Sequence, residues 1–456
     1  MRDVDLQLLL EMNQPVPRYT SYPTAPAWGD FSPTQYEDKL KLVAKNKEPL
    51  SLYVHIPFCR TMCLYCACSV VLNRKKERED EYVRALLQEI ALVSSHIGKE
   101  NEVIQLHFGG GTPTQLSIEE LSKLFDKLHA SFQMDKAKEI AIEIDPRTVH
   151  EDGGKKLKEL QALGFNRVSF GVQDVDPKVQ EAVKRRQSLE VTQDTYYKAR
   201  ELQFESINID LIYGLPFQTE SSFSHTVDAI LELRPDRIAL FSYAQVPHLK
   251  PHQKAIREEW LPSTEEKFRI YLLARRRFVE AGYKAIGMDH FALPDDELAR
   301  GYLNKTLHRN FQGYTVFEAE NLLPLGMTSI GYVEGAFVQN AKDLEEYMQK
   351  MDQGILAVKR GKELSLDDHI RRYTILSLMC HFEVDKLEFE KRFEISFDSY
   401  FEKELHQLST FYERGFLQES SSKLLVTPLG ELFIRNIASN FDSYLNTLST
   451  PFSKAI

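Results

Sequence analysis

The fold and the chemistry of this chain centre on one stretch, Tyr53-Val54-His55-Ile56-Pro57-Phe58-Cys59-Arg60-Thr61-Met62-Cys63-Leu64-Tyr65-Cys66-Ala67-Cys68, which holds four of its five cysteines. The stretch opens with the apolar character of a β-strand. Cys59, Cys63 and Cys66 follow with the spacing C-x3-C-x2-C, so a short loop can curl around one corner of an iron–sulfur cube. A [4Fe–4S] cluster usually has a thiolate on each of its four irons. Three ligands therefore leave one iron open as a binding site.

Other interpretations of these cysteines fit the spacing less well. A structural zinc site more naturally shows two separated C-x2-C pairs, or cysteines with histidines. A thioredoxin-like pair at Cys63 and Cys66 leaves Cys59 and Cys68 unexplained. Disulfides are disfavoured because the chain has five cysteines, an odd number, and shows no signal peptide. The spacing favours the cluster, and a zinc site is the remaining alternative.

The bulk composition limits the class of protein. The chain has 456 residues, of which 43% are hydrophobic and 27% are charged, which is ordinary for a soluble globular protein. A formal net charge of −10 argues against a nucleic-acid partner, whose binding surface is usually basic. No apolar window approaches the roughly 18 residues of a membrane span. We therefore expect a cytoplasmic protein without membrane insertion, in a compartment that keeps thiols reduced.

From residue 51, strand-like runs alternate with amphipathic helical patterns. The predicted strands are 51 to 56, 104 to 108, 139 to 145, 167 to 172, 206 to 213, 236 to 243 and 283 to 288. Strands that alternate with helices require right-handed crossovers and a parallel sheet. The predicted fold class is therefore α/β, a partial or complete (βα) barrel. Such barrels carry their chemistry at the carboxyl ends of the strands.

Three domains are expected. Residues 1 to 50 are predicted to form an N-terminal arm, because prolines interrupt them repeatedly. Within the arm, residues 18 to 25 are either a strap or a segment whose Arg18 and tyrosines reach a substrate. Residues 51 to 362 are predicted to form the barrel with its closing loops. Residues 363 to 456 are predicted to form a small, mostly helical, winged-helix-like domain, in which Cys380 is a buried core thiol.

Unusual polar or glycine-rich segments follow the predicted strands. The first strand is followed by the cysteine loop, and the second by the glycine turn, Gly109-Gly110-Gly111-Thr112-Pro113-Thr114, where backbone can approach a ligand closely. The later strands end at Glu143 to Arg147, at Gln173 and Asp174, at Asp210 to Pro216, and at Tyr243 and Ala244. A glycine triplet is often only a tight turn, and a buried carboxylate such as Glu143 is costly without a partner. Their coincidence at one barrel face favours a functional site.

The cysteine spacing resembles that of radical S-adenosylmethionine (SAM) enzymes. In them, SAM chelates the open iron, and one electron from the cluster splits it into methionine and a 5′-deoxyadenosyl radical. The cysteine loop, the glycine turn, the arm at 18 to 25 and the loop at 308 to 314 together resemble the oxygen-independent coproporphyrinogen III oxidase (dehydrogenase) family of haem biosynthesis. This resemblance runs over nearly the whole chain.

The resemblance implies a set of site residues. Cys59, Cys63 and Cys66 match the cluster ligands. The family binds two SAM molecules, one of them on the cluster, and the matching contacts of that first SAM are Tyr53, Gly110, Glu143 and Ile330. The matching contacts of the second SAM are Tyr65, Gly111, Thr112, Gln173, Arg185, Asp210 and Ala244. Cys68 lies between the two sets and is the expected catalytic cysteine.

Two positions depart from the family's usual residues. Ala67 stands where the family usually has glycine, and Tyr65 stands where it usually has phenylalanine. Alanine constrains the backbone beside Cys68 if that position needs a positive φ.

The resemblance also implies substrate and partners. The expected substrate is a tetracarboxylate porphyrinogen, coproporphyrinogen III, whose two propionates become vinyl groups with loss of CO2. Arg18 and Arg309 are candidate clamps because a guanidinium pairs bidentately with carboxylate. The expected partner is a one-electron donor protein such as a flavodoxin, and the expected state is a monomer.

Two related families are the alternatives. A haem chaperone keeps the three cluster cysteines but lacks the fourth cysteine and the arm, so Cys68 and residues 18 to 25 argue against it. A radical SAM methyltransferase that degrades haem is also expected to lack the arm.

Overall fold

The chain folds into two units, shown in a computed structural model that describes residues 6–317, 319–447 and 452–454. The first, here called the sheet unit, comprises residues 29–261 and 317–363. The second, the helical unit, comprises residues 1–28, 262–316 and 364–456. The two contain the α/β fold and the mostly helical C-terminal region that the sequence predicts.

The units divide the chain differently from the three predicted domains, except near residue 363. The predicted arm is split, because β1 (Gly29–Asp30) pairs with β17 (Val358–Glu363) in the sheet unit. Residues 262–316 belong to the helical unit, because α10 (Thr264–Glu280) contributes Phe268 to its hydrophobic core.

A mixed sheet organises the sheet unit, with strand order β1-β17-β16-β15-β14-β2-β5-β6-β7-β8-β9. Neighbours from β14 to β9 are parallel, and those from β14 back to β1 are antiparallel. The strands are β2 (Leu50–Ile56), β5 (Val103–Gly110), β6 (Glu139–Ile144), β7 (Arg167–Gln173), β8 (Ser206–Tyr213), β9 (Arg237–Ser242), β14 (Asn321–Leu325), β15 (Ile330–Val333) and β16 (Ala336–Asn340). The first six predicted strands are confirmed. In the described part of the chain the sheet starts at β1 and does not return to it, so the barrel is partial.

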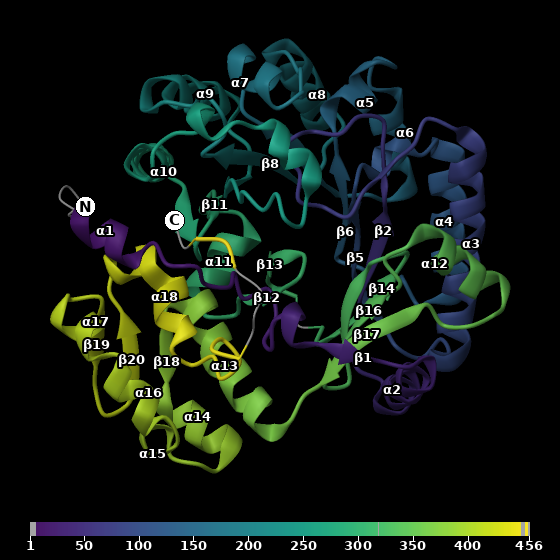
Figure 1. Ribbon diagram of the computed structural model, residues 1–456. Coiled ribbons are helices and arrows are strands. Elements are labelled where there is room, and N and C mark those ends of the chain that lie inside the picture. The colour runs from purple at the N-terminus through teal and green to yellow at the C-terminus, as the bar shows by residue number, and fades with distance from the viewer. Residues whose placement is uncertain (1–5, 318, 448–451, 455–456) are drawn as a thin grey trace. The chain divides into compact units, whose positions relative to one another are not determined.

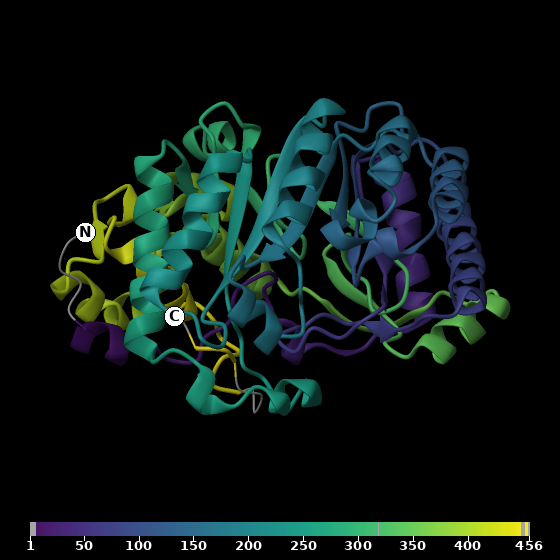
Figure 2. The ribbon, with the colours of Figure 1, turned by 90° about the horizontal axis from the view of Figure 1, so that it is seen from above.

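Helices follow the strands in the expected crossover pattern, and α3 and α4 lie along the outside of β5 and β2 (Figures 1 and 2). The helices of the unit are α2 (Pro33–Asn46), α3 (Lys76–Ile97), α4 (Ile118–Ser131), α5 (Pro146–His150), α6 (Lys155–Leu163), α7 (Pro177–Ala182), α8 (Leu189–Glu201), α9 (Glu220–Leu233) and α12 (Leu344–Asp352), with 3-10 turns η2 (Pro113–Gln115), η3 (Pro251–Ala255) and η4 (Glu258–Trp260). Ser117 and Glu120 form a capping box at α4, and the Asp176 side chain caps α7. None of the described helices is both long and apolar enough to cross a bilayer.

The helical unit combines hairpins with a winged-helix-like module. Its elements are α1 (Leu6–Met12), η1 (Ala25–Ala27), α10, β10 (Lys284–Ile286), β11 (His290–Ala292), α11 (Glu297–Leu303), β12 (His308–Asn310), β13 (Gly313–Thr315), α13 (Leu366–His381), β18 (Glu383–Asp385), α14 (Lys386–Phe393), α15 (Phe397–Tyr400), α16 (Glu402–Gln407), α17 (Ser409–Glu413), β19 (Leu417–Glu419), β20 (Lys423–Val426), η5 (Gly430–Phe433) and α18 (Ile434–Ser439). In this module β19 pairs antiparallel with β20 to form a small hairpin. The seventh predicted strand exists as β10, but it pairs antiparallel with β11 and does not extend the parallel series.

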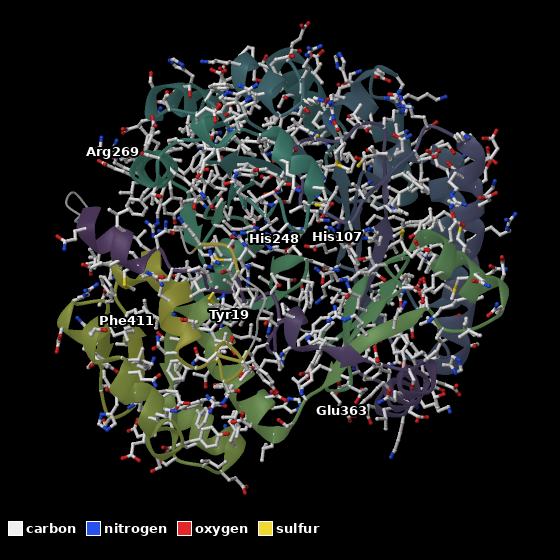
Figure 3. The ribbon with its side chains drawn as sticks, viewed as in Figure 1. Tyr19, His107, His248, Arg269, Glu363 and Phe411 are labelled. Carbon is white, nitrogen blue, oxygen red and sulfur yellow. The ribbon has the colours of Figure 1, made fainter. Side chains whose placement is uncertain are left out.

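The arm residues Tyr19 and Tyr22 are core residues of the helical unit. They are 1% and 0% exposed, and their hydroxyls bond Asp442 (3.1 Å) and Ser443 (3.0 Å). Figure 3 labels Tyr19 and Phe411, which belong to the same hydrophobic cluster. The alternative that these tyrosines reach a substrate is therefore wrong, because their rings and hydroxyls are used inside the unit.

Candidate active site

The cysteine loop starts at the carboxyl end of β2 and is fastened at both sides. The two-residue strands β3 (Phe58–Cys59) and β4 (Val71–Leu72) pair with each other, which closes residues 60–70 into a loop. In its middle, the backbone N–H of Leu64 donates to the carbonyl of Val183 at 2.9 Å. The Leu64 side chain packs against Val183 in a buried cluster. The loop is therefore held on the sheet unit.

The four loop cysteines are free thiols with graded exposure. Cys63 is buried, Cys59 and Cys66 are partly buried, and Cys68 is exposed. Cys59 Sγ lies 3.4 Å from the hydroxyl of Thr112, and Arg185 Nη1 donates to Cys63 Sγ at 3.7 Å. Arginine and hydroxyl donors stabilise sulfur in its anionic form, which is the form that binds metal.

The thiols differ in acidity. The Cys68 thiol donates a hydrogen bond that lowers the pKa of Cys66 to about 6, and nearby Lys250 and His252 act in the same direction. Burial raises the pKa of Cys59 to about 11. The pKa of Cys68 is raised, chiefly because its proton is shared with Cys66. Cys66 is thus more ready than Cys59 or Cys68 to act as a thiolate.

The loop thiols are not gathered around a single point. Among the described residues, no three His, Cys, Asp or Glu side chains form a group that could hold one metal ion. In an iron–sulfur cube each thiolate binds a different iron. The expectation that Cys59, Cys63 and Cys66 are cluster ligands rests on their spacing in the sequence.

The glycine turn packs tightly against the start of the cysteine loop. Gly110 has φ +121°, and a Cβ there would lie 2.6 Å from the His55 ring. A Cβ on Gly111 would lie 2.6 Å from the carbonyl oxygen of Pro57. The N–H of Thr112 donates to the carbonyl of Phe58 at 2.9 Å. These glycines are required for contact between the turn and the loop, whether or not a ligand also approaches them.

Glu143 is an ionised carboxylate at the end of β6. Its Oε2 accepts from the backbone N–H of Gly110 at 3.1 Å, and its Oε1 accepts from His107 Nε2 at 3.3 Å. Burial acts to raise the pKa of Glu143, but the bonds from His107 and Gly110 prevail and lower it. The side chain stays 42% exposed. Glu143 therefore presents a negative charge that is partly free to meet a cationic ligand; Figure 3 labels its partner His107.

A chain of hydrogen bonds connects Tyr53 to the cysteine loop through His55. Tyr53 OH lies 3.1 Å from His55 Nδ1, and His55 Nε2 lies 3.1 Å from the carbonyl oxygen of Ser69. Because a carbonyl only accepts, Nε2 carries the proton and Nδ1 accepts from Tyr53. Burial lowers the pKa of His55 to about 4, so this imidazole is neutral at neutral pH.

Arg185 is held in an ion-pair network beside Cys63. Its Nη1 donates to Asp145 Oδ2 at 3.1 Å, and Arg147 donates to the same carboxylate at 2.6 Å. Although burial opposes it, the two guanidinium groups lower the pKa of Asp145 to about 2. Arg185 Nε is buried and has no hydrogen-bond partner within the part of the chain that the structure describes. The guanidinium is thus fixed in direction and retains one donor.

The other predicted site residues lie in or beside several strands of the sheet unit. Gln173 follows a bulge of β7 and has φ +70°. Asp210 on β8 accepts from Ser169 Oγ (3.1 Å) and Asn208 Nδ2 (2.7 Å). The remaining predicted residues are Tyr65 in the loop, Ala244 after β9 and Ile330 at the start of β15. Ala67 is not among the residues with positive φ, so alanine is not strained there.

The sequence prediction does not include His55 and His107 as residues of the site. It also does not predict the ion pairs of Asp145. A signal for His107 exists, since β5 pairs it with Tyr53 in β2 and with Ala141 in β6. Side chains alternate along a strand, so Glu143 lies on the same face as Ala141. A polar histidine within an apolar strand could have been matched to Glu143 on this basis.

The helical unit holds the two arginines predicted as clamps. Arg18 forms an ion pair with Asp289, which also accepts from His290 Nδ1 at 2.6 Å. Arg309 is 6% exposed and lies over the Tyr314 ring at 4.4 Å. Its Nε and Nη1 have no hydrogen-bond partner among the described residues. Arg18 is therefore neutralised by a carboxylate, whereas Arg309 keeps unused donors.

Comparisons with known proteins show which family this chain resembles. The radical SAM superfamily model matches residues 53–230, and the HemN C-terminal domain model matches residues 364–433. Relatives named oxygen-independent coproporphyrinogen III oxidase include one from Synechocystis, 42% identical over 99% of this chain and 97% of its own. Another, from Escherichia coli, is 42% identical over 97% of this chain and 96% of its own.

A solved structure supports the same assignment. It is the coproporphyrinogen III oxidase (HemN) from Escherichia coli, described as a radical SAM enzyme, with a TM-score of 0.91 and 41% identity. The match covers 97% of this chain and 99% of that one. With the cysteine loop, the glycine turn and the ionised Glu143 at the carboxyl ends of parallel strands, the chain belongs to the oxygen-independent coproporphyrinogen III oxidase family of radical SAM enzymes.

Proposed function

We propose that this chain converts coproporphyrinogen III into protoporphyrinogen IX by oxidative decarboxylation of two propionate side chains to vinyl groups, a step of anaerobic haem biosynthesis. The observation that carries the proposal is the full-length similarity to relatives of that name, together with a C-x3-C-x2-C loop on the first strand of the parallel series. The family implies a [4Fe–4S] cluster and SAM, which together supply a primary radical able to take a hydrogen atom from the propionate β-carbon.

Cys59, Cys63 and Cys66 are the proposed cluster ligands. The fit rests on their free thiols, on the low pKa of Cys66 and on the donors that Thr112 and Arg185 direct at sulfur. Cys68 is the proposed catalytic cysteine, because it is the exposed thiol of the loop.

Two SAM molecules per active site are proposed. The first is assigned to Tyr53, Gly110, Glu143 and Ile330, since the free part of the Glu143 carboxylate can accept a hydrogen bond from the amino group of SAM and complements its cationic sulfonium. The second is assigned to Tyr65, Gly111, Thr112, Gln173, Arg185, Asp210 and Ala244. Arg185 Nε can donate to a carboxylate, and the hydroxyl-rich ribose can meet Asp210.

Arg309 is the preferred substrate clamp. Its buried, unsatisfied Nε and Nη1 are guanidinium donors of the kind that pair with a propionate carboxylate. Arg18 is a weaker candidate, because Asp289 already neutralises it. We further propose a cytoplasmic monomer that receives electrons from a flavodoxin-like donor.

Product analysis under anaerobic conditions tests the function. The protein is reconstituted with iron and sulfide and mixed with reductant, SAM and coproporphyrinogen III. Loss of two CO2 from the macrocycle, with formation of methionine and 5′-deoxyadenosine, is the expected result. SAM cleavage with an unchanged macrocycle would exclude this substrate, and tight haem binding would then indicate the related chaperone.

A further inference from the structure

Side chains of a short segment after β9 donate hydrogen bonds to backbone carbonyls of the cysteine loop. Lys250 Nζ donates to the carbonyl of Cys68 at 2.7 Å. His252 Nε2 donates to the carbonyl of Cys66 at 2.7 Å, and Gln253 Nε2 donates to the carbonyl of Tyr65 at 2.9 Å. We call residues 250–253 the carbonyl clamp. It places three side-chain donors on the part of the loop that carries the third cluster cysteine and Cys68.

Gln253 anchors the clamp to the sheet unit. Its side chain is fully buried, and its Nε2 also donates to the carbonyl of Ala244 at 3.2 Å. Its Oε1 accepts from the N–H of Val246 at 2.6 Å. Both the nitrogen and the oxygen of the Gln253 amide are therefore hydrogen-bonded, and the amide connects the cysteine loop to the segment that follows β9. Such a satisfied buried amide fixes orientation, because any rotation would leave polar groups unpaired.

Fixing a carbonyl also fixes the amide that follows it. In a trans peptide the C=O of one residue and the N–H of the next point in opposite directions. The clamp therefore turns the N–H groups of Ala67 and Ser69 away from residues 250–253. Backbone amides and nearby charges are among the features that set the reduction potential of an iron–sulfur cluster.

Lys250 adds a positive charge at this position. Its ammonium group donates a hydrogen bond directly to the Cys68 carbonyl. The positive charge of Lys250 also helps to lower the pKa of Lys342, although burial and Arg360 lower that pKa more. Reducing a thiolate-bound cluster adds negative charge, so a neighbouring cation favours the reduced state.

We propose that the carbonyl clamp is a positioning element of the cluster loop, and that the Lys250 ammonium raises the reduction potential of the bound cluster. The inference rests on the proposed assignment of Cys59, Cys63 and Cys66 as cluster ligands. Lys250, His252 and Gln253 act through the loop, so they are positioning residues and not catalytic ones.

The test is a potentiometric titration of the reconstituted full-length protein, followed by electron paramagnetic resonance. Lys250→Met is expected to lower the equilibrium constant for reduction about tenfold, which is about 59 mV for one electron. Iron content should stay at the wild-type level. Lys250→Arg should restore the potential, because it keeps the charge. Lys254→Met is the matched control, since Lys254 is exposed and four residues away in the same segment.

The hydrogen bonds are tested apart from the charge. His252→Gln retains an N–H donor and is expected to keep iron as the wild type does, whereas His252→Ala should lose iron to a chelator several times faster. Both substitutions leave buried Gln253 intact, so the anchor of the clamp is kept. Equal rates of iron loss in His252→Ala and the wild type would overturn the positioning role of His252.

The outcomes separate this inference from the proposed function. A Lys250→Met potential equal to that of the wild type and of Lys254→Met would overturn the clamp's electrostatic role while the cluster remains. If the wild type bound no cluster, or Cys63→Ala retained it, the ligand assignment itself would fail.

Discussion

The Glu143 carboxylate accepts a hydrogen bond from the backbone N–H of Gly110 at 3.1 Å, which joins the end of β6 to the glycine turn after β5. This bond allows an acidic side chain to remain ionised inside a sheet, with His107 as its second donor. It also brings together two residues that are 33 positions apart in sequence. The site thus depends on strand register as much as on the cysteine motif.

Replacing Glu143 with glutamine should weaken SAM binding with little change in shape. A hydrogen bond to a charged group contributes about 1.5 to 3 kcal/mol, so we expect the dissociation constant for SAM to rise about tenfold or more. Calorimetric titration of the cluster-loaded protein measures it. Glu139→Gln is the control, because Glu139 begins the same strand and bonds Arg167 and Gln105 instead. Equal SAM affinity in Glu143→Gln and wild type would contradict the assignment.

Alanine at Gly110 should destabilise the fold. Its φ of +121° disfavours any side chain, and the added Cβ would lie 2.6 Å from the His55 ring. Backbone strain of this kind costs about 1 to 3 kcal/mol, before the clash is counted. Urea unfolding measures the loss. Gly98→Ala separates the two effects, since Gly98 has φ +78° but no neighbouring atom within 4 Å of the place that a Cβ would occupy. Similar losses in both variants would mean that the His55 contact is unimportant.

The parallel core was predictable because its strands are long and apolar. Strands predicted at 51 to 56 and 206 to 213 occur at Leu50–Ile56 and Ser206–Tyr213. Beyond residue 287, the strands β11, β12 and β13 are three residues each, so they leave too little periodicity to detect. The longer strands β14 to β17 were not predicted either, because they do not alternate with helices as the earlier strands do. Local pattern therefore sufficed for the βα series and not for the strands that follow it.

The cysteine motif is visible in the local sequence, but the surroundings of its thiols are not. Contacts such as His252 to Cys66 and Arg185 to Cys63 join residues 186 and 122 positions apart. Tyr19 and Tyr22 looked equally suited to substrate or core, because an aromatic residue with a hydroxyl serves in both. Only tertiary packing, which buries both rings in the helical unit, decides between these alternatives.

Removing the guanidinium of Arg309 should weaken substrate binding. Arg309→Met keeps much of the volume of the side chain but loses the unsatisfied Nε and Nη1 donors. We expect the KM for coproporphyrinogen III to rise about tenfold, the range of a charge-assisted hydrogen bond. Arg269→Met is the control, since Arg269, labelled in Figure 3, is an exposed residue of α10. Its guanidinium pairs with Glu265. An unchanged KM with unchanged thermal stability would remove Arg309 from the substrate site.

Because of Asp145, the free energy of unfolding of the sheet unit should depend on pH. Its pKa falls to about 2 through Arg185 and Arg147, against an unfolded value of about 3.9. A depressed carboxyl pKa stabilises the fold above the unfolded pKa, and this contribution is lost as the pH falls from about 4 toward 2. The side chain is 10% exposed, so the contribution is up to about 2 kcal/mol. Asp145→Asn should flatten the pH dependence of urea unfolding in that window.

The exposed aspartate Asp126 on α4 provides the comparison for this measurement. Asp126→Asn should leave the pH dependence of the free energy of unfolding unchanged. If Asp145→Asn retained the acid sensitivity of the wild type, another carboxylate would be responsible for it.

Cys68 should be dispensable for the cluster but required for the reaction. It is the exposed thiol of the loop, and it lies outside the C-x3-C-x2-C triplet that is proposed to hold the cluster. Cys68→Ser is therefore expected to retain the wild-type iron content and the spectrum of the reduced cluster. The variant should lose at least about 90% of the vinyl product, because a hydroxyl lacks the redox and hydrogen-donating chemistry of a thiol. Cys63→Ser, made in parallel, should lose the cluster. Loss of iron in Cys68→Ser would instead make Cys68 a ligand, and full activity would leave it without a catalytic role.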